Sequence, residues 1–242
     1  MTVIAETLHC DVVRISGGDA ERLSTAVRHA EALGQGGAQV VLVTGCELSA
    51  FAHGFLPGDT YLDRLKAMAT ADIHWWTSLG PVPERLNAIL AQATTTVRAH
   101  FGGKVTYASG PWEPVDWARF DVVGVDAYRT AQNADTFRTH LREFFSHGKP
   151  LVMTEYGTCA YRGAGDLGSM AWQPPHRTTP DEDEQVRYLN ELLDIFEEEG
   201  VDTALWFSFA NYDKLRDRDI ASYGVVRLLD EPAGSRKGSS TP

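Results

Sequence analysis

Two glutamates follow short apolar segments of the sequence. Glu47 comes after the apolar run in VVLVTGCE, and Glu155 ends the run LVMTE. A carboxylate next to such a run is costly to bury unless it is paired or used in chemistry. One such glutamate could simply cap the next helix or pair with an arginine. Two carboxyl groups at one edge of a sheet suit the cleavage of a glycosidic bond, in which one protonates the leaving oxygen and the other attacks or directs water.

Five more residues lie inside or just after strand-like segments and are candidate substrate-binding residues: Arg14, Trp112, Asp126, Tyr128 and Trp206. Arg14 lies within DVVRIS, where its guanidinium needs a carboxylate partner because an unpaired buried charge is expensive. Aromatic faces pack against sugar rings, although buried Trp and Tyr are more often ordinary core residues. The segment 158–179 is too long for a passive connection, so we expect a lid or substrate loop there unless it is disordered.

Six short β-branched segments predict the strands that would position these side chains: 11–16, 39–45, 105–109, 121–126, 151–155 and 203–209. Their nearly continuous hydrophobicity is typical of a parallel sheet that is covered on both faces. The carboxyl ends of parallel strands meet at one edge, where α/β barrels build their active sites. Both glutamates are therefore expected at the same edge.

Helices are predicted between the strands from apolar spacing and end signals. Asp19 begins one that ends before Gly34, Asp59 begins a second, Pro83 begins a third, and 137–145 forms a fourth. The segment 179–182 (TPDE) has the pattern of a capping box at the start of the last helix. This alternation predicts an α/β fold, either a TIM-type (β/α) barrel or a doubly wound sheet. No linker divides the chain, so we expect one domain over 1–230 and a disordered tail over 231–242.

The composition argues against several function classes. Acidic residues outnumber basic ones by 33 to 22, for a formal net charge of −11, which disfavours nucleic acid and anionic membranes as partners. No apolar run approaches the roughly 20 residues of a membrane span, and there is no signal-peptide layout. Three scattered cysteines favour a reducing compartment, so we expect a cytoplasmic protein with free thiols at Cys46 and Cys159. The sequence has no nucleotide-binding glycine motif, no G-x-S-x-G and no metal-ligand spacing, so we expect neither cofactor nor metal.

The strand-end residues together resemble those of clan A glycoside hydrolases, which are retaining (β/α)8 barrels. The string TEYG at 154–157 is similar to the one that carries the nucleophile in that clan. The resemblance implies that Glu155 is the nucleophile and that Glu47 is the acid/base. It also implies that Arg14 hydrogen-bonds the nucleophile, that Tyr128 lies beside it, and that Trp206 lies under the sugar.

Longer strings, VTYASGPWE, TEYGTCAYRG and IASYGVV, resemble a group of bacterial glycosidase-like barrels often labelled abortive infection proteins. The resemblance extends from about residue 8 to residue 229. The chain also departs from these families. Cys46 stands where the clan usually has Asn, the first strand is missing before residue 10, and 35–37 leaves no room for a third strand and helix. Six firm strands are fewer than the eight of a closed barrel of this kind.

Three explanations fit the missing strands. The barrel could be open, with its edges covered by loops or by a second copy in a homodimer. The start could be internal to a longer gene, or the barrel could be reduced and have lost its activity. Three functions stay open from the sequence: a retaining glycoside hydrolase or transglycosidase acting on a β-linked sugar, a non-catalytic binding or regulatory barrel, and an enzyme for a small metabolite that reuses the carboxylates. The missing strands favour the second. For the first function we expect a raised pKa at Glu47 and a lowered pKa at Glu155.

Overall fold

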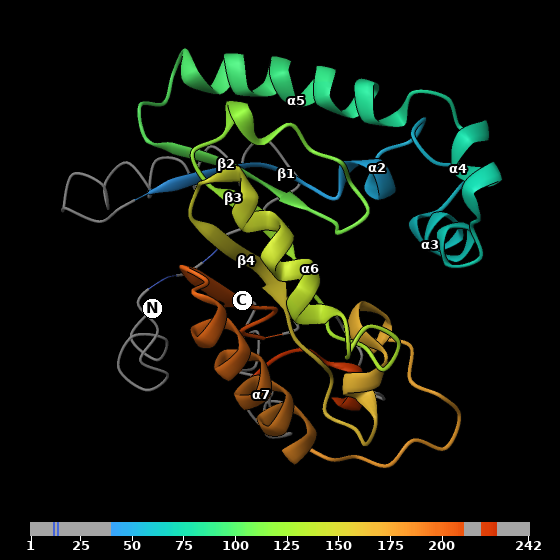
Figure 1. Ribbon diagram of the computed structural model, residues 1–242. Coiled ribbons are helices and arrows are strands. Elements are labelled where there is room, and N and C mark those ends of the chain that lie inside the picture. The colour runs from blue at the N-terminus through green and yellow to red at the C-terminus, as the bar shows by residue number, and fades with distance from the viewer. Residues whose placement is uncertain (1–11, 13, 15–39, 211–218, 227–242) are drawn as a thin grey trace, which may run out of the picture. The chain divides into compact units, whose positions relative to one another are not determined.

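The computed structural model describes residues 12, 14, 40–210 and 219–226 of the chain. Five strands form one sheet in the order β1-β2-β3-β4-β5 (Figure 1): Val41–Cys46, Lys104–Ser109, Val123–Asp126, Leu151–Tyr156 and Thr203–Trp206. The pairs β1–β2, β2–β3 and β3–β4 are parallel. The predicted α/β fold with a parallel sheet is thus confirmed. The predicted strand 11–16 lies outside the described residues, apart from positions 12 and 14.

The described part of the chain contains six α-helices besides these strands: α2 (Leu48–Phe51), α3 (Tyr61–Ala69), α4 (Ile73–Ser78), α5 (Val82–Arg98), α6 (Phe137–Phe144) and α7 (Asp183–Glu199). Single 3₁₀ turns occur at Trp117–Arg119, Phe145–His147, Ala164–Asp166, Gly168–Met170 and Asp219–Ala221. The predicted second, third, fourth and last helices correspond to α3, α5, α6 and α7. The helix predicted from Asp19 lies outside the described residues.

Two helix starts differ from the prediction. α3 is capped by Thr60 rather than by Asp59, because Thr60 and Asp63 cap each other's backbone N–H groups in a capping box. α7 begins at Asp183 rather than at Pro180. Residues 179–181 instead pair with 160–162, where the Arg162 N–H donates to the Thr179 carbonyl and the Asp181 N–H donates to the Ala160 carbonyl, each at 3.0 Å. Pairing in this antiparallel bridge holds the segment extended, so it cannot be the first turn of a helix.

The chain divides into two compact units. The first comprises Met1–Tyr128, Asp135–Tyr156 and Leu193–Leu205, and the second comprises Arg129–Ala134, Gly157–Leu192 and Trp206–Pro242. The single domain over 1–230 and the disordered tail over 231–242 therefore stay predictions. All the described strands except the last residue of β5 belong to the first unit.

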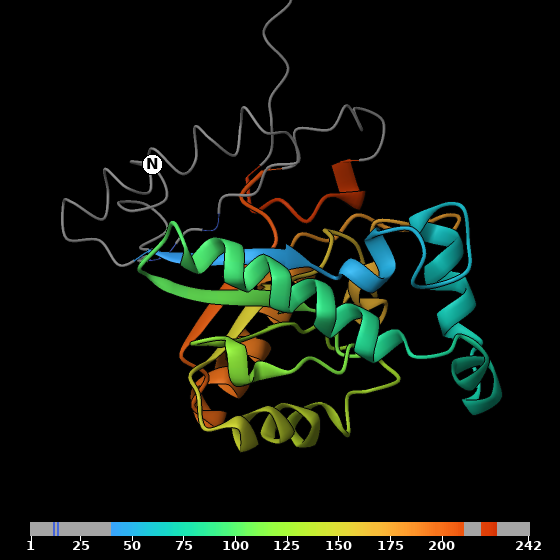
Figure 2. The same ribbon diagram turned by 90° about the horizontal axis from the view of Figure 1, so that it is seen from above.

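The core of the first unit lies between the sheet and its helices. α5 runs along β1 and β2 (Figure 2) and buries Val82, Leu86, Leu90 and Thr94, which follow one another at intervals of four residues. That spacing places them on one face of a helix. The sequence predicts an apolar stripe of Leu86, Ile89, Leu90, Ala93 and Val97, of which Leu86 and Leu90 are buried, whereas Ile89 is 45% exposed. Strands β2 and β3 are buried along almost their whole length. The rigid carboxyl ends of these strands can therefore hold side chains in fixed positions.

In the second unit, the segment 158–179 is packed against its own residues. The side chains of Thr158, Cys159, Ala164 and Ala171 are fully buried, and the Tyr161 hydroxyl donates to the Ala171 carbonyl at 2.6 Å. Its predicted role as a lid or substrate loop stays a prediction.

Cys159 and Cys46 are both free thiols, as predicted.

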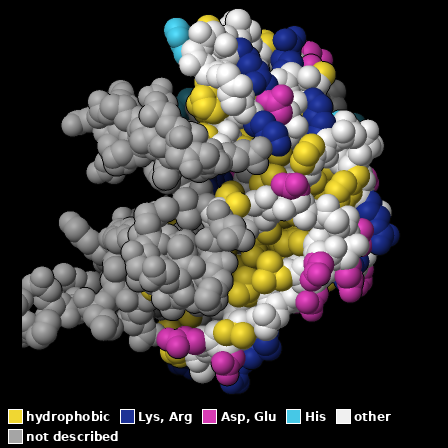
Figure 3. All heavy atoms as spheres, turned by 90° about the vertical axis from the view of Figure 1, so that its left-hand side faces the viewer, with side chains coloured by type: hydrophobic (Ala, Val, Ile, Leu, Met, Phe, Trp, Pro, Cys, Tyr) yellow, Lys and Arg dark blue, Asp and Glu magenta, His cyan; other side chains and the backbone are white. Residues whose placement is uncertain are grey.

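The surface of the described residues is mixed in charge. On the face shown in Figure 3, acidic and basic side chains lie interspersed around an area of hydrophobic surface.

No helix in the described part of the chain is both long enough and apolar enough to cross a bilayer.

Candidate active site

Three strands of the first unit, β1, β3 and β4, carry acidic residues at their carboxyl ends. Glu47 follows β1, Asp126 ends β3, and Glu155 is the penultimate residue of β4. Asp126 and Glu155 are paired across β3 and β4. The register shifts on β1 just before Cys46 and between β3 and β4 just before Asp126. Such bulges re-aim side chains near active sites, and here both occur at the strand ends that carry the acidic residues.

The Glu155 carboxylate accepts hydrogen bonds from an arginine and a tyrosine. Arg14 Nη1 donates to Glu155 Oε1 at 3.1 Å and to the Thr154 carbonyl at 3.0 Å, and the Tyr128 hydroxyl donates to Glu155 Oε2 at 3.3 Å. The glutamate therefore pairs with an arginine, and it still keeps some contact with solvent because 18% of its side chain is exposed. The arrangement gives Glu155 one defined orientation.

Asp126 lies behind this pair and has no exposed side-chain surface. Its Oδ1 accepts from the Thr154 hydroxyl at 2.6 Å and lies 3.9 Å from Arg14 Nη1, and its Oδ2 accepts from Cys46 Sγ at 3.3 Å. Burial, together with the charge of Glu155, raises the pKa of Asp126 to about 7. Its predicted contact with substrate stays a prediction, because the structure gives it only protein partners among the described residues.

The pKa of Glu155 is shifted in the direction opposite to the prediction. Burial raises it above the usual range of a glutamate, and the opposing effects of Arg14 and Tyr128 do not offset that burial. The predicted lowering is therefore wrong: one guanidinium serves both Glu155 and Asp126, so its stabilisation of either carboxylate is shared. Burial and the two carboxylates raise the pKa of the Cys46 thiol as well, which keeps it neutral and able to donate.

Glu47 has an unusual backbone conformation and a carboxyl group that does not cap the following helix. Its φ of 40° and ψ of 45° are left-handed, and its side chain makes no capping hydrogen bond to α2. The alternative that Glu47 merely caps the next helix is therefore wrong. The Tyr61 hydroxyl donates to Glu47 Oε2 at 3.2 Å. Burial, together with the charges of Asp126 and Glu155, raises the pKa of Glu47 to about 8.

The two tryptophans are placed differently. The Trp112 indole N–H donates to the Ser49 hydroxyl at 3.0 Å, and its ring lies so close to Gly110 that a Cβ there would be 2.5 Å from a ring carbon. Trp112 is therefore attached to the start of α2, next to Glu47. Trp206 belongs to the second unit, where its indole N–H donates to the Tyr223 carbonyl at 2.9 Å. Its contact with substrate stays a prediction.

Sequence reasoning missed two residues around Glu47. Tyr61 lies within a predicted helix and Tyr107 within a predicted strand, where nothing marks either as different from a core tyrosine. The position of Glu113 after the strand 105–109, beside Trp112, places it at the same edge of the sheet, but the sequence assigns it no role. Tyr107 and Glu113 are both buried, Tyr107 fully and Glu113 to 6% exposure.

Cys46, Asp126 and Glu155 also form a group of potential metal ligands. One ligand atom from each lies within 4.8 Å of the others. Arg14 already places a positive charge among them through its contacts with both carboxylates. The expected absence of a metal and of a cofactor stays a prediction.

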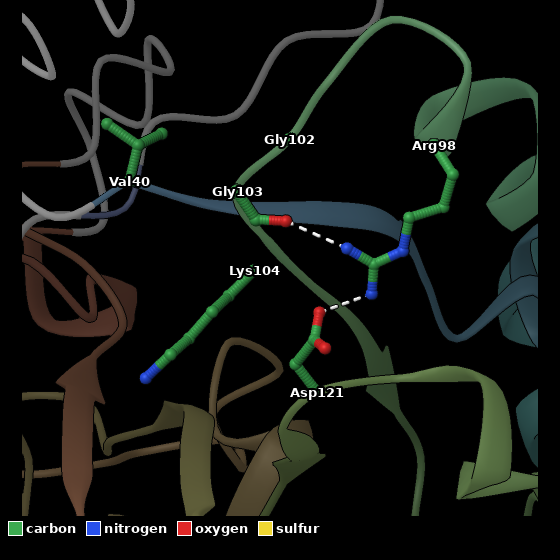
Figure 4. A pocket seen from close by; sticks show the side chains of 6 residues that line it. All are labelled: Val40, Arg98, Gly102, Gly103, Lys104 and Asp121. Carbon is green, nitrogen blue, oxygen red and sulfur yellow. Dashed lines mark hydrogen bonds and ion pairs between the residues drawn. The ribbon is translucent and has the colours of Figure 1, made fainter.

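A separate cavity of about 340 Å³ lies at the other end of the strands (Figure 4). It is lined by Val40, Arg98, Gly102, Gly103, Lys104 and Asp121. The Arg98 guanidinium already donates to the Gly103 carbonyl and to Asp121, as the dashed lines in Figure 4 show. This cavity is distant from the carboxyl ends of the strands and contains none of the predicted site residues.

The raised pKa of Glu47 predicts how stability depends on pH. Its folded-state value of about 8 exceeds the ordinary 4.5, so the folded state keeps a proton that the unfolded state loses as pH rises between those values. This contribution to stability is complete below pH about 4.5 and is lost as the pH rises through about 8. We therefore expect Glu47→Gln to raise the free energy of unfolding at pH 9, by at most about 5 kcal/mol, and to change it little at pH 4.5.

Urea unfolding at the two pH values measures this difference. Glu84→Gln is the matched control, because Glu84 is an exposed glutamate in the first turn of α5. The same stability change at both pH values would contradict the predicted ionisation of Glu47.

Comparison with known proteins supports the fold. Neither a protein-family model nor a curated protein matches the sequence. A solved GH113 β-1,4-mannanase matches 86% of this chain over 74% of its own, with 17% identity and a TM-score of 0.56. The GH113 β-mannanase of Alicyclobacillus acidocaldarius matches 60% of this chain with 21% identity and a TM-score of 0.48, and this chain spans 47% of it. A GH17 β-1,3-glucanosyltransferase from Rhizomucor miehei has 20% identity, a TM-score of 0.48, and coverage of 85% of this chain and 77% of its own.

These structural neighbours are glycoside hydrolases with TIM-barrel folds. The TM-score of 0.56 over 86% of the chain gives this protein the same α/β class, a partial TIM-type barrel. At 17% identity the similarity concerns the fold alone. The resemblance to barrels labelled abortive infection proteins has no support from these comparisons and stays a prediction.

Proposed function

We propose that this protein is a retaining glycoside hydrolase, or transglycosidase, acting on a β-linked sugar. The observation that carries the proposal is the unequal environment of two carboxyl groups in one unit. Glu155 receives hydrogen bonds from Arg14 and Tyr128, which favour its ionised form, whereas Glu47 receives one from Tyr61 and has a pKa of about 8. Unlike environments give two carboxyl groups different pKa values. One group can then attack as a carboxylate while the other transfers a proton.

In the first step, an oxygen of Glu155 attacks the anomeric carbon. The bond from that carbon to the glycosidic oxygen breaks, its electron pair stays on the oxygen, and Glu47 supplies the proton that neutralises the leaving group. Arg14 and Tyr128 orient Glu155 for this attack, because they hold one oxygen each.

In the second step, ionised Glu47 takes a proton from water. The water oxygen attacks the anomeric carbon, the ester bond to Glu155 breaks, and its electron pair returns to the carboxylate, where Arg14 and Tyr128 stabilise the charge. A sugar hydroxyl in place of water gives transglycosylation. Two inversions leave the anomeric configuration unchanged.

The remaining site residues have supporting roles in this proposal. Asp126 acts through Arg14 and Cys46 rather than on the sugar, since its side chain is completely buried. Trp112, which is attached to the start of α2 next to Glu47, offers an aromatic face for a sugar ring. The proposed partner is an oligosaccharide or a smaller glycoside.

A second candidate is a non-catalytic barrel that binds carbohydrate. Two observations favour it: the pKa of Glu155 is raised rather than lowered, and Cys46 occupies the position where the clan has Asn. Binding of a sugar in a calorimeter without turnover of any glycoside would support this candidate against the hydrolase.

The hydrolase is tested by a panel of 2,4-dinitrophenyl and 4-nitrophenyl β-glycosides, including the mannoside, glucoside, galactoside and glucuronide. The reactive form has Glu155 ionised and Glu47 protonated. For substrates whose leaving group needs the acid, such as 4-methoxyphenyl β-glycosides, we therefore expect a bell-shaped dependence of kcat/KM on pH. Its basic limb should lie at about 8, and its acidic limb should lie above the ordinary range of a glutamate, because burial raises the pKa of Glu155.

Stopped assays between pH 4 and pH 10 measure this profile. Absence of turnover across the whole panel would contradict the proposed function. A kcat/KM for the 4-methoxyphenyl β-glycoside that stays constant up to pH 10 would contradict the role of Glu47 as the acid.

A further inference from the structure

The turn that presents Glu47 is built in an unusual way. Glu47 adopts a left-handed backbone conformation, which residues with a side chain rarely do, and α2 begins with the next residue. The first N–H groups of a helix have no partner within the helix, and the side chain of the preceding residue commonly accepts from one of them. The Glu47 side chain does not do so.

Two residues from the neighbouring strand and loop accept these hydrogen bonds instead. The Leu48 N–H donates to the Tyr107 hydroxyl oxygen at 2.6 Å, and the Ser49 N–H donates to Glu113 Oε1 at 2.8 Å. The Tyr107 hydroxyl in turn donates to Glu113 Oε2 at 2.9 Å, and the Gly110 N–H donates to the same oxygen at 3.0 Å. One buried carboxylate thus connects the start of α2 with the end of β2.

This arrangement has a consequence for Glu47. If its own carboxyl group capped α2, that group would lie against the backbone and would not reach a substrate. Because Tyr107 and Glu113 accept from the first N–H groups of α2, the carboxyl group of Glu47 is not needed as a cap. It accepts a hydrogen bond from Tyr61 instead. The Glu47 N–H also donates to the Ala108 carbonyl at 2.9 Å, so both sides of the turn are attached to the same strand.

We propose that Glu113 is the positioning residue for Glu47: its carboxylate caps α2 in place of Glu47 and so aims the Glu47 carboxyl group at the leaving oxygen of the substrate. This inference rests on the proposed hydrolase function. Glu113 is a positioning residue and not a catalytic one, since it is buried and its two oxygens already accept from the Ser49 N–H, the Gly110 N–H and the Tyr107 hydroxyl.

The test is Glu113→Gln, which keeps the shape of the side chain but replaces one acceptor oxygen by an amide that donates. One of the three donors now directed at Glu113 then loses its partner, so the turn loosens. We expect kcat/KM to fall by about 10²-fold for glycosides with poor leaving groups such as 4-methoxyphenol, which need the acid. For 2,4-dinitrophenyl glycosides, which leave without protonation, we expect a change of less than about 3-fold.

Two further variants control for a general loss of structure. Asp121→Asn is the matched control, because Asp121 also accepts from a backbone N–H of the β2 region, that of Val105, but does so at the other end of the strand. It should affect both leaving groups equally. Tyr107→Phe removes the acceptor of the Leu48 N–H and should reproduce the selective loss even if Glu113→Gln does not fold. An equal loss on both leaving groups in Glu113→Gln and in Tyr107→Phe, or no loss in either, would overturn the proposal.

A measurement independent of turnover separates this proposal from the hydrolase function. Amide hydrogen exchange of the Leu48 and Ser49 N–H groups can be followed by NMR in wild type and in Glu113→Gln. In the folded protein these two groups donate to the Tyr107 hydroxyl and to Glu113 Oε1, so a loosened turn exposes them to exchange. We expect both groups to exchange at least about 10-fold faster in the variant than in wild type. Unchanged exchange at both groups would overturn the positioning role, whereas failure of wild type to hydrolyse any glycoside would overturn only the hydrolase.

Discussion

Replacement of Glu155 by Gln is expected to lower kcat by at least about 10⁴-fold, because the reaction loses its nucleophile while the site keeps its shape. The amide oxygen is a poor nucleophile, and the amide N–H₂ cannot accept from Arg14 or Tyr128. One of the two hydrogen bonds that now hold Glu155 is therefore lost as well. Steady-state rates with a 2,4-dinitrophenyl β-glycoside measure the effect, since this leaving group makes the assay sensitive to attack rather than to proton transfer.

A trapping experiment identifies the attacked residue directly. A 2-deoxy-2-fluoro glycoside with a good leaving group slows both steps and lets the ester intermediate accumulate. We expect mass spectrometry to find the adduct in wild type on the peptide that contains Glu155, and to find none in Glu155→Gln. Glu191→Gln is the matched control, because Glu191 is also paired with an arginine, Arg129, but lies in the second unit. Turnover by Glu155→Gln at the wild-type rate would refute the assignment.

The strands were predictable because burial leaves a clear signal in sequence. The predicted segments 39–45, 105–109 and 151–155 correspond to Val41–Cys46, Lys104–Ser109 and Leu151–Tyr156, with ends that differ by one or two residues. A strand buried on both faces has to be apolar along its length, so few alternative assignments fit. The ends of helices were less predictable.

Helix starts depend on contacts that sequence does not display. Asp59 and Thr60 can each cap a helix, and only the reciprocal hydrogen bonds with Asp63 select Thr60. The segment 179–182 has the pattern of a capping box, yet its backbone pairs with 160–162, a partner about 20 residues away in sequence. In this segment, backbone pairing with a distant part of the chain prevents the helix start that the local sequence favours.

The candidate site was partly predictable because it follows from the parallel sheet. Parallel strands bring their carboxyl ends to one edge, and Arg14 accordingly meets Glu155 although 141 residues separate them. The left-handed turn at Glu47 and its support by Glu113 could not be predicted, because any of several neighbours could have capped α2. The direction of the Glu155 pKa could not be predicted either, since it depends on how deeply the pair is buried and on the sharing of Arg14 with Asp126.

Replacement of Glu47 by Ala is expected to separate proton transfer from displacement. For substrates with poor leaving groups, kcat/KM should fall by about 10³-fold, because the leaving oxygen departs without a proton. For 2,4-dinitrophenyl glycosides it should stay within about 10-fold of wild type, because their leaving group needs no acid. The basic limb at about 8 should disappear from the pH profile, because Glu47 is the group whose ionisation produces it.

Azide provides the second half of this test. In Glu47→Ala, breakdown of the ester on Glu155 is slow because no base activates water, whereas azide attacks without a base. We expect azide to raise kcat for the dinitrophenyl substrate and to yield a glycosyl azide of retained configuration, with no such effect in Glu84→Ala, in which an exposed glutamate of α5 is removed. An equal loss on all leaving groups without rescue would mean that Glu47 supports the fold rather than the proton transfer. Because its side chain makes no helix cap and has Tyr61 as its hydrogen-bond donor, the selective outcome is the one that the geometry favours.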